Sequence, residues 1–168
     1  MYKNILVAID GSDMGDRAVS LASDLSRAHG ARLVVMHVLD LEDEKPDLIR
    51  LSGSEIVDPS GVVAQNALHT ARQHIMEAVQ SRRNVALDVA AGLLNSAKMH
   101  ARDDGVAKVD TIVEIGKPAE CILEAAKREQ ADAIVMGCHG YSDLKGLFVG
   151  SVSHQVAHDA DCACIAIT

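Results

Sequence analysis

The chain is 168 residues long, carries a formal net charge of −8 at pH 7 and contains no Trp, one Phe and two Tyr. This length is sufficient for one well-buried domain and short for two. The acidic balance disfavours general binding of nucleic acid, and the scarcity of aromatic residues argues against the stacking platforms that bind single strands. A core of Val, Ile, Leu, Ala and Met suits a parallel sheet covered by Ala-rich helices.

The amino-terminal segment and the cysteines indicate a cytoplasmic protein. Residues 2–10 form a short apolar run without a signal-peptide cleavage site, and no apolar run approaches the length of a membrane span. Without a secretory signal, the four cysteines are expected to be reduced thiols. We therefore expect a protein of the cytoplasm, with no membrane insertion.

The first predicted elements form a βαβ unit. Residues 3–10 are apolar on both faces, as in an interior parallel strand. Residues 11–13 turn the chain and offer an N-cap to an amphipathic helix, which Gly30 ends. Residues 32–38 are predicted to be the second strand. In a unit of this length the two strands are parallel and the crossover is right-handed.

The middle of the chain combines a polar segment with a long helical pattern. Residues 40–60 are acidic and predict a loop, with a short helical turn around residues 47–51. Residues 62–104 have helical periodicity throughout. Because ordinary helices are much shorter and residues 81–84 offer a break, we expect two helices or one kinked helix.

Strands and helices alternate again in the second half of the chain. The pattern predicts strands at residues 109–115, 133–136 and 163–167, a helix with Pro118 in its first turn, and a helix over about 151–158. This alternation predicts a doubly wound α/β layer. In such sheets the ligand lies beyond the carboxyl ends of the strands, where the strand order reverses.

A glycine motif follows the strand at 133–136. It consists of Gly137 and Gly140, then nine residues, then Gly150-Ser151 at the start of the last helix. Glycines let backbone N–H groups approach a ligand closely, and a helix start attracts negative charge. Glycines alone would favour a surface turn, but the flanking strand and helix favour a loop that holds phosphates.

Four stretches of the sequence resemble the universal stress protein family. They are residues 5–12, residues 34–38, the glycine motif and residues 162–167, in this order. The resemblance implies a single domain over residues 1–168 with a doubly wound, five-stranded parallel sheet of order 3-2-1-4-5, an adenine-nucleotide alpha-hydrolase-like (Rossmann-like) α/β fold. The segment around residues 40–85 matches less well and is interpreted as an insertion.

The resemblance also implies a ligand and an assembly. The expected ligand is ATP, or else ADP, AMP or cyclic AMP, with Mg²⁺ accompanying the triphosphate. The family often dimerises through its last strand, and the apolar edge strand at residues 162–167 predicts a homodimer here. A nucleotide-sensing, regulatory role in the stress response follows, with a regulated protein that the sequence does not identify.

The family's binding residues can be carried over to matching positions. The resemblance places the Asp10 carboxylate near the ribose, whereas the residue alone would fit an Asx-turn or a helix cap. It implies that backbone groups of Val38 bind the adenine edge, although Val38 alone is typical of a core residue. The predicted nucleotide-binding residues are Ala8, Asp10, Val38, Met136, Gly137, His139, Gly140, Gly150, Ser151, Val152 and Ser153.

Several residues around the glycine motif allow two interpretations. His139 and Lys145 fit either a solvated loop or phosphate contacts. Ser151 and Ser153 fit helix-start positions, but the motif favours phosphate contacts for both. Cys138 stands where the family commonly has Ser or Thr, so it is a candidate redox thiol, although one small residue replacing another is the favoured interpretation.

Neither a metal site nor a catalytic arrangement is predicted. Cys162 and Cys164 share one face of a strand, and His154 and His158 share one face of a helix, but no CxxC or HExxH spacing occurs. The GxSxG motif and the P-loop ending are absent, and no base is placed to activate water. We expect nucleotide binding without efficient hydrolysis. The alternatives are a slow ATPase or nucleotide-processing enzyme, and a nucleotide-free interaction module.

Overall fold

The computed structural model describes residues 1–40, 62–138 and 150–168. The strands are β1 (Asn4–Ala8), β2 (Arg32–Leu39), β3 (Val109–Ile115), β4 (Ala133–Gly137) and β5 (Ala163–Ile167). The helices are α1 (Asp13–His29), α2 (Val62–Asp103), α3 (Pro118–Arg128) and α4 (Ser151–Asp159). β3 and β5 have the predicted bounds, and β1, which was expected to reach residue 10, ends two residues earlier.

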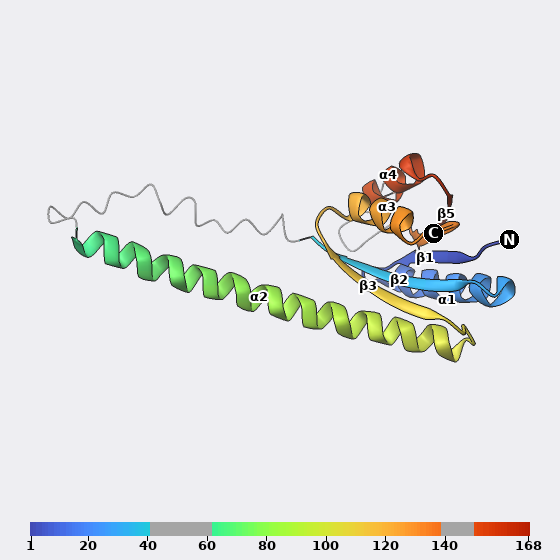
Figure 1. The fold of residues 1–168 in the computed structure, drawn as a ribbon, viewed down its shortest axis with the longest axis horizontal. Coiled ribbons are helices and arrows are strands. Elements are labelled where there is room, and N and C mark those ends of the chain that lie inside the picture. Colours follow the sequence, from blue (N-terminus) through green and yellow to red (C-terminus); the bar gives the residue numbers. More distant parts are fainter. Residues whose placement is uncertain (41–61, 139–149) are drawn as a thin grey trace.

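The strands form one parallel sheet of order β3-β2-β1-β4-β5. Figure 1 shows α1 and α2 on one face of this sheet and α3 and α4 on the other. The doubly wound α/β architecture and the strand order expected from the sequence are therefore confirmed. The order reverses between β1 and β4, which are adjacent in the sheet although most of the chain separates them.

Two separate apolar clusters cover the faces of the sheet. Because side chains alternate along a strand, β1 sends Leu6 toward α3 and α4, and sends Ile5 and Val7 toward α1 and α2. These three side chains are fully buried, as are Val35 and Ile134 on the neighbouring strands. Burial of each such side chain contributes about 1.5–3 kcal/mol. Strands buried on both faces therefore require the uninterrupted apolar runs from which they were predicted.

The ends of α1 are set by the residues that the sequence indicated. Ser12 is the N-cap, and its hydroxyl accepts a hydrogen bond from the N–H of Gly15 at 3.2 Å. Gly30 ends the helix with φ at 64°, a left-handed conformation that glycine adopts without steric cost. The helix therefore stops two residues before β2 begins, and β2 returns beside β1.

The continuity of α2 corrects the expectation of two helices or a kinked helix. It runs over 42 residues without interruption, so residues 81–84 do not form a break. None of these four residues is Gly or Pro, and the side chains of Gln80 and Asn84 are hydrogen-bonded at 3.0 Å across the stretch. The expected break rested on the average length of helices. That average does not limit a helix whose apolar stripes remain in phase along its whole length.

Only part of α2 packs on the sheet. Its buried side chains include Ala90, Leu94, Ala97 and Ala101. Figure 1 shows its amino-terminal half projecting past the carboxyl ends of the strands; Met76 and Val79 in that half are exposed. Despite this length, no helix among the described residues is long and apolar enough to cross a membrane. The loop and helical turn predicted before α2 fall on residues 41–61, outside the described residues.

Candidate functional site

The carboxyl ends of β1 and β4 lie side by side, and the chain leaves them toward opposite faces of the sheet. α1 follows β1 on one face, and α4 follows β4 on the other (Figure 1). Ligands of doubly wound sheets bind at such a point. Most predicted site residues reach this edge: Ala8, Asp10, Val38, Met136, Gly137, Gly150, Ser151, Val152 and Ser153. His139, Gly140 and Lys145 lie outside the described residues.

Asp10 is oriented by the turn that follows β1. Its Oδ1 accepts hydrogen bonds from the N–H of Ser12 at 3.0 Å and from the Ser12 hydroxyl at 2.6 Å. The Asx-turn interpretation of Asp10 therefore holds. Within the described part of the chain no partner bonds Oδ2, and the residue is exposed. This second oxygen is placed to accept a hydrogen bond from a ligand hydroxyl.

The main-chain N–H and carbonyl of Val38 point to the side of β2 on which β1 lies. Backbone groups of successive residues point alternately to the two neighbouring strands. The carbonyl of Met36 accepts from the N–H of Ile9 at 2.9 Å, on the β1 side. The carbonyl of Leu39 accepts from the N–H of Gly116 at 3.0 Å, on the β3 side. Val38 therefore faces the β1 side at a level where β1 has ended, and no described backbone group bonds to it from there.

A hydrogen-bonded latch joins the end of β4 to the start of α4. The carbonyl of Cys138 accepts from the N–H of Gly150 at 2.7 Å, and the Ser153 hydroxyl lies 2.9 Å from the same carbonyl oxygen. Ser153 is 4% exposed, so its hydroxyl is directed at the main chain rather than at a ligand. The latch holds the start of α4 against the carboxyl end of β4.

The first turn of α4 presents backbone donors without intrahelical acceptors. Gly150 is the N-cap and makes no side-chain cap. Intrahelical bonding begins with the N–H of His154 on the carbonyl of Gly150 at 3.0 Å. The N–H groups of Ser151, Val152 and Ser153 precede that bond, and the helix dipole adds partial positive charge there. This end of α4 can bind an anion.

Two residues at the end of β4 have buried side chains. Met136 belongs to the cluster beneath α3 and α4 and is 4% exposed, so only its main chain can reach a ligand. Cys138 is 3% exposed, and its N–H donates to the carbonyl of Ile167 at 2.8 Å. Burial of this thiol supports the interpretation of Cys138 as a small structural residue.

Sequence reasoning missed His37. Its Nδ1 lies 2.8 Å from the carbonyl oxygen of Ile9, at the same edge of the sheet. Because that oxygen can only accept, Nδ1 carries the proton and donates. The available signal was a polar residue that interrupts the apolar run of residues 33–39, immediately before Val38.

The cysteines and histidines that raised a metal interpretation do not form a cluster. Among the described residues, no group of three or more His, Cys, Asp or Glu is arranged to hold a metal ion. Burial raises the pKa of the Cys162 and Cys164 thiols, which disfavours the thiolate that binds metal. His158 Nδ1 lies 2.6 Å from Oδ1 of Asp159 on its own helix.

The sheet order agrees with the family suggested by the sequence, and the comparison with family models decides the matter. The model of the universal stress protein family matches residues 1–168. The chain belongs to the universal stress protein family. A universal stress protein of Thermus aquaticus, from the QAH/OAS sulfhydrylase 3′ region, is 35% identical over 96% of both chains. Universal stress protein YxiE of Bacillus subtilis is 32% identical, also over 96% of both.

Solved structures of universal stress proteins share this fold. Protein MJ0577 of Methanocaldococcus jannaschii has a TM-score of 0.75 at 23% identity, over 99% of this chain and 96% of that chain. A universal stress protein in complex with cAMP has a TM-score of 0.64 at 20% identity, and the match covers 99% of this chain and 97% of that chain. A universal stress protein from Archaeoglobus fulgidus in complex with dAMP has a TM-score of 0.58 at 22% identity, and the match covers 99% of this chain and 98% of that chain.

Proposed function

We propose that this universal stress protein binds ATP, or a related adenine nucleotide, at the carboxyl edge of the sheet and acts as a nucleotide-sensing regulator without efficient hydrolysis. One observation carries the proposal. Backbone groups without described partners, from Val38 and from the first turn of α4, flank the end of β1 on opposite sides. This arrangement suits a ligand with a neutral hydrogen-bonding ring at one end and an anionic group at the other.

The phosphates lie at the start of α4 in this proposal. The N–H groups of Ser151 and Val152 supply donors there, supported by the helix dipole. Ser153 contributes its N–H rather than its hydroxyl, because the hydroxyl is bonded within the latch. The glycines of the motif, Gly137 and Gly140, allow the backbone to approach the phosphates.

The base and the ribose lie on the β2 side of the same edge. Adenine offers both an amine donor and ring-nitrogen acceptors, which complement the N–H and carbonyl of Val38. The free Oδ2 of Asp10 accepts a hydrogen bond from a ribose hydroxyl. The two solved relatives with cAMP and dAMP carry adenine nucleotides, which supports the same base class for this chain.

A triphosphate beside an acidic protein requires a cation. With a net charge of −8, the chain favours binding of ATP together with Mg²⁺, which offsets the phosphate charge. Efficient hydrolysis is not expected in this proposal, because the sequence has neither a GxSxG motif nor a P-loop ending and no spacing in it places a base to activate water. The protein that it regulates is not identified. The proposal also includes a cytoplasmic location and a homodimer that pairs through residues 162–167.

Calorimetry with ATP, ADP, AMP, cyclic AMP and GTP, each with Mg²⁺, tests the proposal, together with native mass spectrometry for a co-purifying nucleotide. We expect adenine nucleotides to bind more tightly than GTP, and Gly140→Val to weaken ATP binding by at least about tenfold. Turnover of about 1 per second or faster would identify an enzyme and contradict the sensor role. Absence of any nucleotide binding would favour a nucleotide-free interaction module.

A further inference from the structure

The β1–β2 ladder stops one hydrogen bond early, and a side chain occupies the missing place. The N–H of Ile9 still donates to the carbonyl of Met36 at 2.9 Å. In a parallel ladder the next bond would run from the N–H of Val38 to the carbonyl of Ile9. The described residues do not make that bond; Nδ1 of His37 donates to the Ile9 carbonyl instead, at 2.8 Å.

We propose that His37 is a positioning residue for base recognition: by occupying the Ile9 carbonyl, its imidazole keeps the N–H of Val38 unpaired and available to the ligand. The inference rests on the proposed function, since it assigns a cause to the free donor that the adenine edge would use. His37 does not contact the nucleotide in this scheme. It acts through Ile9 and Val38.

There is a structural reason why His37 Nδ1, and not the N–H of Val38, donates to the Ile9 carbonyl. A buried carbonyl left without a donor costs about 1–3 kcal/mol, so a strand end cannot simply leave the Ile9 carbonyl empty. A half-buried imidazole on the next residue of β2 satisfies it. The main-chain N–H of Val38 is thereby released without leaving the Ile9 carbonyl unsatisfied.

The scheme does not depend on the charge of His37. The neutral ring holds its proton on Nδ1 because the Ile9 carbonyl is an acceptor, and the doubly protonated ring keeps the same donor. The decisive property is therefore a donor at the Nδ1 position. Asparagine places its amide nitrogen close to where Nδ1 of histidine lies, whereas alanine has no donor.

Amide hydrogen exchange in the ligand-free protein tests the first step without any nucleotide. The N–H of Val38 should exchange quickly in the wild type and in His37→Asn. In His37→Ala, the freed Ile9 carbonyl should accept from Val38, and exchange of the Val38 amide should slow by about tenfold or more. Amides of β4 serve as a control for intact folding. Slow exchange in the wild type, or equal exchange in all three proteins, would overturn the proposal.

Base selectivity tests the second step. We expect the preference for ATP over GTP, measured by competition, to fall by about tenfold in His37→Ala and to be retained in His37→Asn. A variant that merely loosens the fold would weaken both nucleotides equally, and that result would contradict a positioning role. If the wild type binds no nucleotide, the proposed function fails, while the exchange experiment still decides what His37 does to Val38.

Discussion

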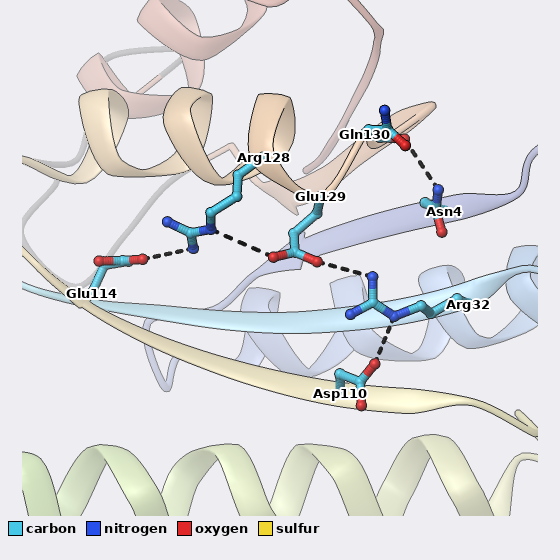
Figure 2. Close-up of polar contacts among 7 residues, drawn as sticks. All are labelled: Asn4, Arg32, Asp110, Glu114, Arg128, Glu129 and Gln130. Atoms are coloured by element: carbon cyan, nitrogen blue, oxygen red, sulfur yellow. Dashed lines mark hydrogen bonds and ion pairs between the residues drawn. The ribbon is translucent and has the colours of Figure 1, made fainter.

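Arg32 and Glu129 join the first residue of β2 to the end of α3, with Nη1 of Arg32 lying 2.9 Å from Oε2 of Glu129. Figure 2 shows the pair within a chain of contacts in which Arg32 also binds Asp110 and Glu129 also binds Arg128. Hydrogen bonds to Asp110 and then to Glu129 raise the pKa of Arg32. The network holds the end of α3 over the first residues of β2 and β3.

Replacing Glu129 by Gln should destabilise the fold. The side chain is 19% exposed and serves two guanidinium groups, so the loss is larger than for an open surface pair. We expect the free energy of unfolding, measured by urea titration, to fall by about 1–2 kcal/mol after allowance for solvent screening. Asp24→Asn is the matched control, because its pair with Arg27 is exposed on both sides. An equal effect of both substitutions would contradict the network.

The carboxylate of Asp132 fastens the start of β1 and should make stability depend on pH. It accepts hydrogen bonds from the N–H groups of Asn4 at 2.9 Å and Lys3 at 2.6 Å. These bonds, that of Asn4 first, lower the pKa of Asp132 below its usual value of 3.8. Because the folded pKa lies below the unfolded one, the carboxylate stabilises the fold above the unfolded pKa. That contribution is lost as pH falls through the folded pKa.

Asp132→Asn should therefore have a lower urea midpoint than the wild type at about pH 7, and the gap should close in acid, below about pH 4. Asp161→Asn is the control, since Asp161 is exposed and lies 3.5 Å from the Lys127 ammonium. A gap for Asp132→Asn that stays constant from neutral to acid pH would show that the carboxylate charge is not what fastens β1.

The fold could be predicted from the sequence because its strongest determinants are local. The apolar runs of β1, β2 and β4 match strands buried on both faces, and Gly30 and Pro118 mark helix ends by their own backbone properties. The uninterrupted α2 could not be predicted from length statistics, because continuity depends on whether each residue tolerates a helix.

The candidate site was predictable only in part. Asp10 and Val38 were predicted through the family resemblance. For Val38 no other route existed, because a main-chain donor leaves no trace in the type of side chain at its position. The hydrogen bonds of His37 and Ser153 escaped sequence reasoning because each is made to a carbonyl distant in the sequence, that of Ile9 and that of Cys138. Such contacts can be recognised only when the register of the sheet is known.

The latch predicts different effects for two serines of α4. Ser153→Ala removes the buried hydroxyl that lies 2.9 Å from the Cys138 carbonyl and should cost about 1 kcal/mol of stability. Ser151→Ala alters an exposed residue and should leave the unfolding midpoint unchanged. Calorimetry should show weaker ATP binding for Ser151→Ala if its hydroxyl, as well as its N–H, contacts phosphate. Equal stability of both variants would contradict the latch.

The predicted homodimer concerns the outer edge of β5. β5 is the last strand of the sheet, and Ile167 bonds inward to Cys138, so the N–H of Ala166 faces outward by alternation. Ile165 packs against the cluster beneath α1, so a charge there would damage the core as well as an interface. Ala166 is exposed and gives the sharper test.

Ala166→Pro should convert a dimer to a monomer. Proline removes the outward N–H that antiparallel pairing with a second copy would need, and it leaves the inward bonds to β4 in place. Ala166→Ser keeps the N–H and should remain dimeric, which separates loss of backbone pairing from any change of side chain. Light scattering at micromolar concentration measures the mass of each protein. A wild type that is already monomeric, or a proline variant that stays dimeric, would rule out pairing through β5.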